Sequence, residues 1–413
     1  MRNARVRDSY PLRVAMISQR YFPMVGGAER QVMAVSQELV RSGVEVHVIT
    51  RRFPGLMPAE NISGVTVHRL PAPQPNILAS LSFTLNALPL IHRIKPDVLH
   101  SHELLSPTTT AVMAREIYKI PVVATIHGGG EITRIQQKTL GKTRLRIFRT
   151  HVDRFIAIDQ DIDKQLARLG IPKQLRAWIP NGVDVEHFCP VSRAQKERLR
   201  AEFHLAESPV VVFTGRLVSL KRVDQLISAW AIIRQSFPKA TLLIIGTGPE
   251  ENALKRAAYP EHPSPADVQD DGGTGIIFLG EVQDVAPYLQ TADLFVFPSS
   301  REGLSVSLLE AMACELATIA TDVGGNIDLI HHQQTGWLVP GDDRVEFPTR
   351  LAEAIRILLE DKDLRERIAQ AGRKHIVQSY SLASVVKLLH ALYFELSLAT
   401  SPVINLDQSG RRT

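Results

Sequence analysis

The chain has 413 residues, 44% of them hydrophobic and 22% charged, which is typical of a globular protein long enough for two domains of ordinary size. Its two cysteines, Cys189 and Cys314, are far apart in sequence, which excludes a disulfide framework and indicates a reducing compartment. We expect no signal peptide, because the basic N-terminus lacks an apolar core. We also expect no membrane span at residues 77–91, because this apolar run is shorter than the roughly 20 residues that a span needs.

The charge is unevenly divided along the chain. Residues 1–190 carry 25 Lys and Arg against 15 Asp and Glu, whereas residues 191–413 carry 23 against 28. The first part, with a net charge of +10, should be attracted to an anionic partner such as a membrane surface or an anionic acceptor. The alternative is a solvated surface that happens to be rich in arginine.

Strands and helices alternate in the first part of the chain. Leu12 to Ser18 is a near-continuous apolar run typical of a buried parallel strand, and residues 28–41 have helical spacing that Gly43 ends. Further strands are predicted at residues 44–50, 65–70, 98–100, 122–126 and 155–158. This alternation is the pattern of a doubly wound parallel sheet.

The segment Trp178 to Pro190 interrupts the alternation with two prolines and an Asn-Gly pair, and we place the domain boundary at its end. Strands resume at residues 210–214, 242–245, 276–279, 294–297 and 318–321. The sequence therefore predicts two similar α/β domains, at residues 10–190 and 191–381, with a ligand cleft between them. A long apolar helix at about residues 382–399 needs a partner surface. Residues 260–275 are predicted to form an exposed mobile loop, and residues 400–413 a disordered tail.

In the first domain, candidate site residues follow two predicted strands, where open α/β sheets bind ligands. Gly27 belongs to the stretch Gly26-Gly27-Ala28-Glu29, whose glycines allow backbone to approach a ligand closely. The alternative is a flexible turn with an acid in the first helical turn. His127 precedes three glycines, although a lone histidine is more often structural. His100 and His102 carry the same ambiguity with less weight.

In the second domain, Arg216 and Lys221 lie on the loop after the first strand. A guanidinium fork and an ammonium five residues apart suit the clamping of a diphosphate, and the alternative is ordinary surface charge. Gly246 and Gly248 end the next strand, where they again allow a close approach of the backbone.

Residues 293–320 predict a buried strand, a glycine-containing turn and a helix that begins near Ser305. Free N–H groups at such a helix start bind anions, and the carboxylates of Glu302 and Glu310 accept hydrogen bonds from hydroxyl groups. The combination suits a sugar nucleotide. The alternative is a capped helix that simply packs, with both carboxylates solvated. Helix geometry favours the ligand, because Glu310 lies roughly 7.5 Å along the helix and leaves room for a ligand that reaches both acids.

Together these motifs resemble the family 4 retaining glycosyltransferases, also called glycosyl transferases group 1, from about Leu12 to Leu398. The most specific element is the pair Glu302 and Glu310 in REGLSVSLLEAMACE, joined by GGAE, IPNGVD, GRLVSLKR, IIGTGPE and FLGEV. The resemblance implies the GT-B fold, in which two Rossmann-like domains face a central cleft. The N-terminal domain would lie on the acceptor side and be completed by the C-terminal helix crossing back to it, and the C-terminal domain would bind the donor.

The resemblance also implies roles for individual residues. Arg216 and Lys221 would hold the donor diphosphate, Glu302 the hydroxyls of the donor sugar, and Glu310 the ribose. His127 would lie near the reacting sugar, so the implied catalytic residues are His127, Arg216, Lys221 and Glu302. The remaining implied donor contacts are Gly27 and Gly246 with Gly248, the backbone of Gly303, Leu304 and Ser305 at the helix start, and Glu281 and Val282 against the base.

The implied reaction transfers a sugar from a nucleotide-diphosphate sugar to an acceptor hydroxyl with retention, in glycan, polysaccharide or glycolipid biosynthesis. The acceptor attacks from the side of the leaving group, the leaving phosphate takes its proton, and the two cations with the helix start stabilise the diphosphate. No Asp-x-Asp motif follows a strand, and the family implies independence of metals and cofactors. We expect a sugar, lipid-linked or other glycan acceptor, no nucleic-acid partner, and a cytoplasmic enzyme at the inner face of the membrane.

Some features depart from the family pattern or favour another function. Ser305, the Arg222 that follows Lys221, and the insert at residues 260–275 are unusual, but none removes a residue with an implied role. A sugar-nucleotide epimerase or a glycoside phosphorylase on the same fold should lack the full donor set, and a non-catalytic binding protein should have lost Arg216, Lys221 or Glu302. An NAD-dependent dehydrogenase is disfavoured by the missing glycine fingerprint.

Residues 132–152 contain six Lys and Arg and no Asp or Glu. With the apolar residues 77–91, they predict that the N-terminal domain docks on a membrane carrying a lipid-linked acceptor. The alternative is an ordinary basic helix.

Overall fold

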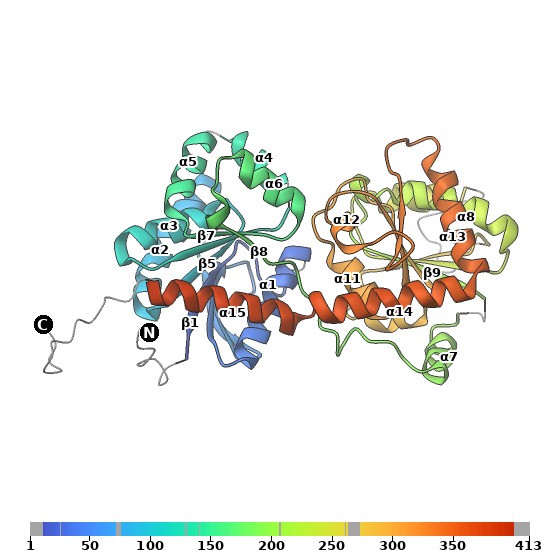
Figure 1. Cartoon of the computed structure of the whole chain (residues 1–413), viewed down its shortest axis with the longest axis horizontal. Coiled ribbons are helices and arrows are strands. Elements are labelled where there is room, and N and C mark those ends of the chain that lie inside the picture. The colour runs from blue at the N-terminus through green and yellow to red at the C-terminus, as the bar shows by residue number, and fades with distance from the viewer. Residues whose placement is uncertain are drawn as a thin grey trace, which may run out of the picture. The chain divides into compact units, whose positions relative to one another are not determined.

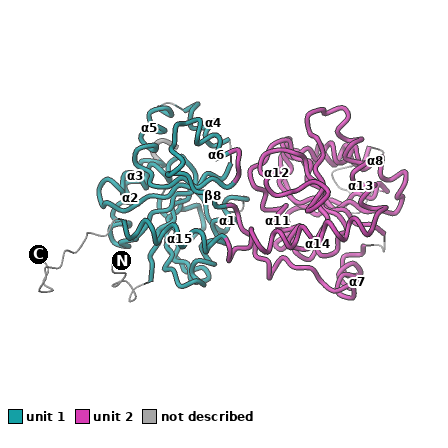
Figure 2. Tube along the Cα trace, in the orientation of Figure 1, with its two compact units in different colours: residues 1–158, 162–179, 385–413 teal, residues 159–161, 180–384 magenta. Residues whose placement is uncertain are grey.

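The computed structural model describes residues 11–24, 26–71, 76–128, 130–138, 140–205, 208–260, 262 and 273–399. They fall into two compact units (Figures 1 and 2). Unit 1 holds the chain up to Ile158, Ile162–Ile179 and the chain from Val385, and unit 2 holds Asp159–Asp161 and Pro180–Ser384. The predicted boundary, between residues 190 and 191, lies further along the chain than the change of unit at Pro180. Gly129, most of the insert at residues 260–275, and the tail at residues 400–413 lie outside the described residues.

In the described part of unit 1, eight strands form one sheet in the order β3-β4-β2-β1-β5-β6-β7-β8. All neighbours are parallel except β3 and β4, which are antiparallel. The apolar runs form the inner strands because a parallel sheet is covered on both faces. The strands are β1 (Arg13–Ile17), β2 (Glu45–Arg51), β3 (Ala59–Ile62), β4 (Val65–Leu70), β5 (Val98–His102), β6 (Val122–Ile126), β7 (Arg154–Ala157) and β8 (Arg176–Trp178).

Helices follow most of these strands, as the crossover connections of a parallel sheet require. They are α1 (Gly27–Arg41), α2 (Asn76–Ile94), α3 (Ser106–Tyr118), α4 (Gly130–Gln136), α5 (Gly141–His151) and α6 (Gln160–Arg168), with the short 3-10 helix η1 (Lys173–Leu175).

The C-terminal helix α15 (Leu382–Ala399) completes unit 1, as predicted (Figure 2). The hydroxyl of Tyr393 and Nδ1 of His100 share a hydrogen bond of 2.6 Å, and Arg154 pairs with Glu395 at 2.5 Å. Among the described residues, α15 is also the one helix long and apolar enough to cross a membrane, and 44% of it is buried inside the protein. Packing against unit 1 therefore gives its apolar face the partner that the sequence requires.

In the described part of unit 2, six parallel strands form a sheet in the order β11-β10-β9-β12-β13-β14. They are β9 (Val210–Thr214), β10 (Thr241–Ile245), β11 (Ile276–Gly280), β12 (Leu294–Phe297), β13 (Ala317–Thr321) and β14 (Trp337–Val339). The helices are α7 (Arg193–Glu202), η2 (Ser219–Lys221), α8 (Val223–Ser236), α9 (Glu251–Ala258), α10 (Ala286–Thr291), α11 (Val306–Ala313), α12 (Gly325–Leu329), α13 (Phe347–Glu360) and α14 (Lys362–Ser379).

Both sheets have the strand order of a Rossmann fold. In unit 2 the first three strands run outward from the centre to one edge, and the chain then returns to the centre and builds toward the other edge. The order therefore reverses between β9 and β12, and in unit 1 between β1 and β5. Open α/β sheets bind ligands beyond the carboxyl ends of the strands at this switch point. The fold thus directs attention to the loops after these four strands.

Candidate functional site

In unit 2, the switch point brings the loop after β9 against the loop after β12. Nζ of Lys221, from the first loop, lies 2.6 Å from Oε1 of Glu302, from the second. The backbone N–H of Ser300 donates to the carbonyl of Leu220 at 2.8 Å. Two segments some 80 residues apart in sequence are therefore joined by an ion pair and a backbone hydrogen bond.

The Lys221–Glu302 pair is mostly removed from solvent. The two side chains are 19% and 12% exposed, and Nζ of Lys221 lies 4.4 Å from the centre of the Phe297 ring at the end of β12. An ammonium held on an aromatic face and a carboxylate has lost most of its water. This site can therefore exchange one anion for another at Lys221 without further dehydration of the cation.

The start of α11 lies directly after Glu302. Ser305 is the N-cap, and its hydroxyl accepts a hydrogen bond from the N–H of Leu308 at 3.4 Å. Nδ2 of Asn181 donates to the carbonyl of Leu304 at 2.8 Å, a buried contact that holds the loop in place. This contact gives the IPNGVD motif a structural role. The N–H groups at the helix start, together with the helix dipole, favour an anion there.

The loop after β13 supports this helix start from the other side. At Gly324, with φ of +49°, a Cβ would lie 1.9 Å from the carbonyl oxygen of Glu302, and at Gly325 it would lie 2.7 Å from that of Gly303. Only glycine fits where two backbones approach this closely. Sequence reasoning missed both residues, although the pair of glycines directly after a predicted strand is a signal that could have identified them.

Gly246 and Gly248 are required for a related reason. A Cβ at Gly246 would lie 2.1 Å from the carbonyl oxygen of Gly215, and one at Gly248 would lie 2.2 Å from that of Leu217. The loop after β10 is thus packed against the loop after β9, which presents the exposed side chain of Arg216. In this structure the two glycines allow the two loops to pack together, and their predicted approach to a ligand stays a prediction.

Glu310 is the fifth residue of α11 and is buried. Glu302 is ion-paired and mostly buried as well, so the alternative of a packed helix with two solvated carboxylates is wrong. Glu281 and Val282 directly follow β11, the edge strand next to β10. Glu281 is exposed and Val282 is half-buried.

In unit 1, Gly27 begins α1 after β1, and a Cβ on it would meet no atom within 4 Å. The backbone at this helix start is therefore open on the side where a side chain would project. Because β1 borders the switch point of this sheet, Gly27 is placed where the fold rule expects a ligand.

His127 belongs to a network of histidines at the ends of β5 and β6. Its Nε2 shares a hydrogen bond of 2.9 Å with Nδ1 of His102, whose ring lies tilted against that of His100 with the ring centroids 4.1 Å apart. Nε2 of His100 contacts the hydroxyl of Thr125 at 2.7 Å, and Tyr393 of α15 occupies its other nitrogen. All three histidines identified in the sequence therefore lie in one connected cluster.

Glu131, which sequence reasoning missed, fixes the backbone beside His127. Its two carboxylate oxygens accept the N–H groups of His127 at 2.8 Å and Leu104 at 3.1 Å. The signal was an acid at the start of the helix that follows the glycine run. Burial, reinforced by the neighbouring Glu103, raises the pKa of Glu131 to about 7 against the effect of the two N–H donors.

The histidines are held in the neutral form. Burial lowers the pKa of His127 to about 4, and burial with the nearby charge of His127 lowers the pKa of His100 to about 3. The pKa of His102 lies well below its usual value because of burial and its two histidine neighbours. At neutral pH, His127 can therefore exchange hydrogen bonds but carries no charge.

Comparisons with known proteins identify the family of the chain. Residues 25–187 match the family described as Glycosyltransferase Family 4, and residues 195–375 match Glycosyl transferases group 1. A GDP-mannose-dependent alpha-mannosyltransferase from Mycobacterium tuberculosis is 30% identical over 386 residues, covering 89% of this chain and 92% of that protein. N-acetyl-alpha-D-glucosaminyl L-malate synthase from Bacillus anthracis is 26% identical over 384 residues, covering 91% and 95%.

Solved structures share the fold. Sucrose-phosphate synthase from Thermosynechococcus elongatus matches with a TM-score of 0.77 at 23% identity, covering 94% of this chain and all of that one. The Anabaena protein HepE in complex with UDP matches with a TM-score of 0.75 at 20% identity, covering 93% of this chain and 100% of that chain.

Proposed function

This chain is a glycosyltransferase of family 4 with the GT-B fold, and we propose that it transfers a sugar from a nucleotide-diphosphate sugar to an acceptor hydroxyl with retention of the anomeric configuration. Unit 2 binds the donor and unit 1 contributes the acceptor side with His127. The product is a glycan, polysaccharide or glycolipid.

The observation that carries the donor proposal is the Lys221–Glu302 pair at the start of α11. A diphosphate that takes Glu302's place on Lys221, and also meets Arg216 and the helix N–H groups, releases the Glu302 carboxylate to accept hydroxyls of the sugar. Glu310 lies about one turn further into the helix, where it accepts the ribose hydroxyls.

Catalysis in this proposal comes from stabilising the leaving group. Arg216, Lys221 and the helix start stabilise negative charge as it develops on the diphosphate, which then takes the proton of the attacking hydroxyl. With the donor bound, Glu302 accepts hydroxyls of the sugar and the buried Glu310 accepts those of the ribose, so neither carboxylate acts as the nucleophile. His127 acts as a neutral hydrogen-bonding group near the reacting sugar, because its pKa of about 4 keeps it uncharged at pH 7.

We further propose that the reaction needs no metal ion. The cations of Lys221 and Arg216 supply the charge that a metal would otherwise provide at the diphosphate. Activity that persists in excess EDTA would support this proposal, and activity restored only by a divalent cation would contradict it.

Thermal-shift measurements with UDP, GDP and ADP, and with their sugars, test the donor proposal, since a ligand that binds the folded state raises its stability. We expect one nucleotide to raise Tm, and Glu310→Ala to weaken that effect while His127→Ala mainly lowers turnover. GDP and UDP are the first choices, because one relative is a GDP-mannose-dependent enzyme and one structural neighbour binds UDP. The proposal fails if no nucleotide stabilises the protein, and the ribose assignment fails if Glu310→Ala binds as well as the parent.

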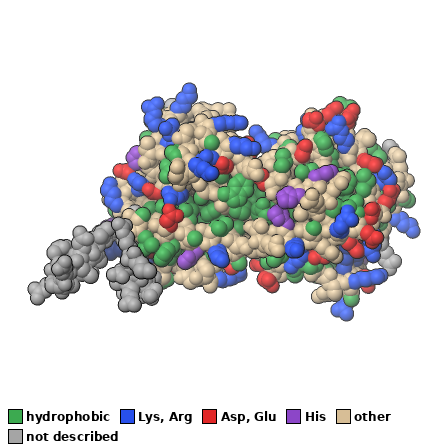
Figure 3. Space-filling model, viewed as in Figure 1, with side chains coloured by type: hydrophobic (Ala, Val, Ile, Leu, Met, Phe, Trp, Pro, Cys, Tyr) green, Lys and Arg blue, Asp and Glu red, His purple; other side chains and the backbone are tan. Residues whose placement is uncertain are grey.

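For its location, we propose the cytoplasmic face of a membrane with a lipid-linked acceptor. Lys and Arg side chains gather over α4 and α5 (Figure 3), and Leu81 and Leu85 of α2 are exposed. A basic surface with exposed leucines suits anionic lipid headgroups. Co-sedimentation with anionic vesicles tests this, and equal binding by a variant with Arg144, Arg146 and Arg149 changed to Gln would exclude it.

A further inference from the structure

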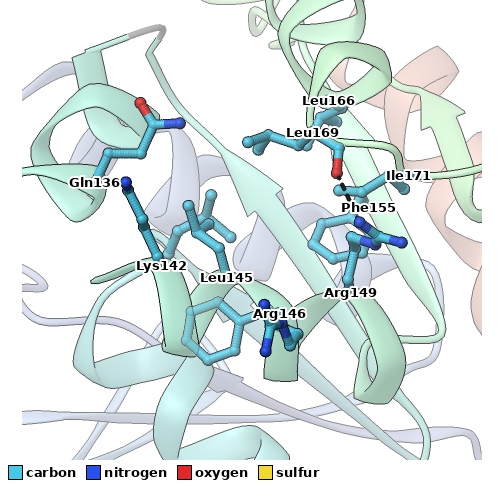
Figure 4. Close-up of a pocket in the computed structure, with 11 residues that line it drawn as sticks. Gln136, Lys142, Leu145, Arg146, Arg149, Phe155, Leu166, Leu169 and Ile171 are labelled. Carbon is cyan, nitrogen blue, oxygen red and sulfur yellow. Dashed lines mark hydrogen bonds between the residues drawn. The ribbon is translucent and has the colours of Figure 1, made fainter. Parts of the chain in front are cut away.

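Unit 1 contains a cavity of about 290 Å³ between α5 and the segment that ends α6 (Figure 4). Its apolar walls include the buried side chains of Phe148, Phe155 and Leu166, with Leu145 on α5 facing Leu169 across the space. This volume is close to the lower limit of about 300 Å³ for typical small-molecule sites. The donor site described above lies in unit 2, so the cavity is a separate feature.

The polar side chains of the cavity carry one sign of charge. Lys142, Arg146 and Arg149 lie at the mouth with the amide of Gln136, and no Asp or Glu is among the described residues that line the cavity. Lys142, Leu145, Arg146 and Arg149 follow the spacing i, i+3, i+4 and i+7, which places them on one face of α5. Arg149 donates to the carbonyl of Leu169 at 3.4 Å, whereas all three cationic side chains are exposed.

The cavity adjoins the elements that hold His127. Leu104 lines the cavity, and its backbone N–H donates to the same Glu131 carboxylate that fixes the N–H of His127. Helix α4 carries Glu131 near its start and ends at Gln136 on the cavity mouth. An occupant of the cavity therefore contacts elements that position the acceptor-side histidine.

We propose that this cavity binds one anionic amphiphile, an alkyl chain with a phosphate or carboxylate head. The chain lies among the phenylalanine and leucine side chains, and the head meets Lys142, Arg146 and Arg149. An alkyl chain matches the apolar side chains that line the wall of the cavity. An anionic head matches the positive charge of the three cations at its mouth. The proposal does not depend on which sugar the enzyme transfers.

Isothermal titration of the full chain with alkyl phosphates, each below its micelle concentration, tests the proposal. We expect one saturable site, with affinity rising roughly fourfold for each added methylene until the cavity is full. Inorganic phosphate should bind far more weakly than any alkyl phosphate. Affinity that is independent of chain length, or equal binding of inorganic phosphate, would overturn the proposal.

Variants distinguish the cavity from the general basic surface. Leu145→Phe and, from the opposite wall, Leu169→Phe fill the space and should each abolish binding of decyl phosphate. Lys142→Gln and Arg146→Gln should each weaken it by about threefold to fivefold. Arg144→Gln is the matched control, because Arg144 lies on α5 outside the cavity and its neutralisation should leave binding unchanged. Decyl phosphate bound as tightly by both filled variants as by the parent would refute the site.

Two further measurements are needed. One shows that each filled variant is folded, and the other identifies the source of the amphiphile. A nucleotide-induced Tm shift equal to that of the parent shows that a filled variant is folded, and it tests the donor site independently of the cavity. Vesicles with an anionic phospholipid distinguish a lipid of the bilayer from a free amphiphile. Loss of vesicle binding in Leu145→Phe indicates a lipid drawn from the bilayer. Vesicle binding retained with loss of decyl phosphate binding indicates a free amphiphile.

Discussion

Replacing Lys221 by Met leaves the Glu302 carboxylate mostly buried without its partner. Fully exposed ion pairs contribute about 0.2–1 kcal/mol, whereas removing one partner of a buried pair costs about 3–5 kcal/mol. With side chains 19% and 12% exposed and atoms 2.6 Å apart, this pair lies between the two classes. We therefore expect Lys221→Met to destabilise unit 2 by about 2 kcal/mol, in line with a charge-assisted hydrogen bond.

A double-mutant cycle measures this energy. Lys221→Met keeps a long unbranched side chain and a favourable contact with Phe297, and Glu302→Gln keeps the shape of the carboxylate. For a unit of about 200 residues, a loss of about 2 kcal/mol lowers Tm by about 4–8 °C. The double variant should regain most of this loss, because no uncompensated charge remains.

The result that refutes the reasoning is additivity. If the double variant loses the sum of the two single losses within about 0.5 kcal/mol, the pair is not coupled. Donor binding supplies a second test: Lys221→Met should bind the nucleotide at least tenfold more weakly, and Lys221→Arg should retain part of the affinity because it keeps the charge.

Three further predictions concern other parts of the site. Asn181→Ala leaves the carbonyl of Leu304 buried without its donor, so unfolding in urea should show a loss of about 1–3 kcal/mol, with a raised KM for the donor. Gly324→Ala places a Cβ against the carbonyl of Glu302 and should weaken nucleotide binding in titration calorimetry without any change of charge. As pH falls from 6.5 through 4, unit 1 should lose stability, because the pKa of His127 is lowered to about 4 in the folded state, and His127→Asn should make this loss shallower in Tm against pH.

Each of these three predictions has a control or a result that would contradict it. Gly280 also has a positive φ but open space around its Cβ, so Gly280→Ala reports backbone strain alone. Equal losses of nucleotide binding in Gly280→Ala and Gly324→Ala would contradict the clash. Unchanged stability of Asn181→Ala, or an unchanged slope in His127→Asn, would contradict the other two.

Particular residues show how far sequence reasoning reaches. The runs at residues 122–126, 210–214 and 294–297 coincide with β6, β9 and β12, because a strand buried on both faces is a nearly continuous apolar run. The alternating pattern at residues 65–70 coincides with β4, in which every second residue is buried. The short strands β3, β8 and β14 were not predicted, since each has only three or four residues. Each of them is a strand because it pairs with a neighbouring strand at the edge of its sheet.

The residues of the candidate site fall into the same two classes: those that the sequence indicates and those whose contacts only the structure shows. Glu302, Glu310, Arg216 and Lys221 could be found from sequence, because anions and hydroxyl groups need these side chains at the ends of strands. The backbone contacts made by Asn181, Gly324 and Glu131 were not predicted, because each joins segments that are separated in the sequence.

The sequence by itself predicted the two parallel sheets and the family, and it identified the charged groups of the candidate site, because burial periodicity and local motifs depend on neighbouring residues. Only the tertiary structure decided which groups meet. It paired Lys221 with Glu302, placed the ring of His100 against that of His102, and joined Tyr393 of the last helix to His100. It also placed three cations of α5 around one apolar cavity. Such contacts depend on strand order and loop packing, and these are properties of the assembled fold.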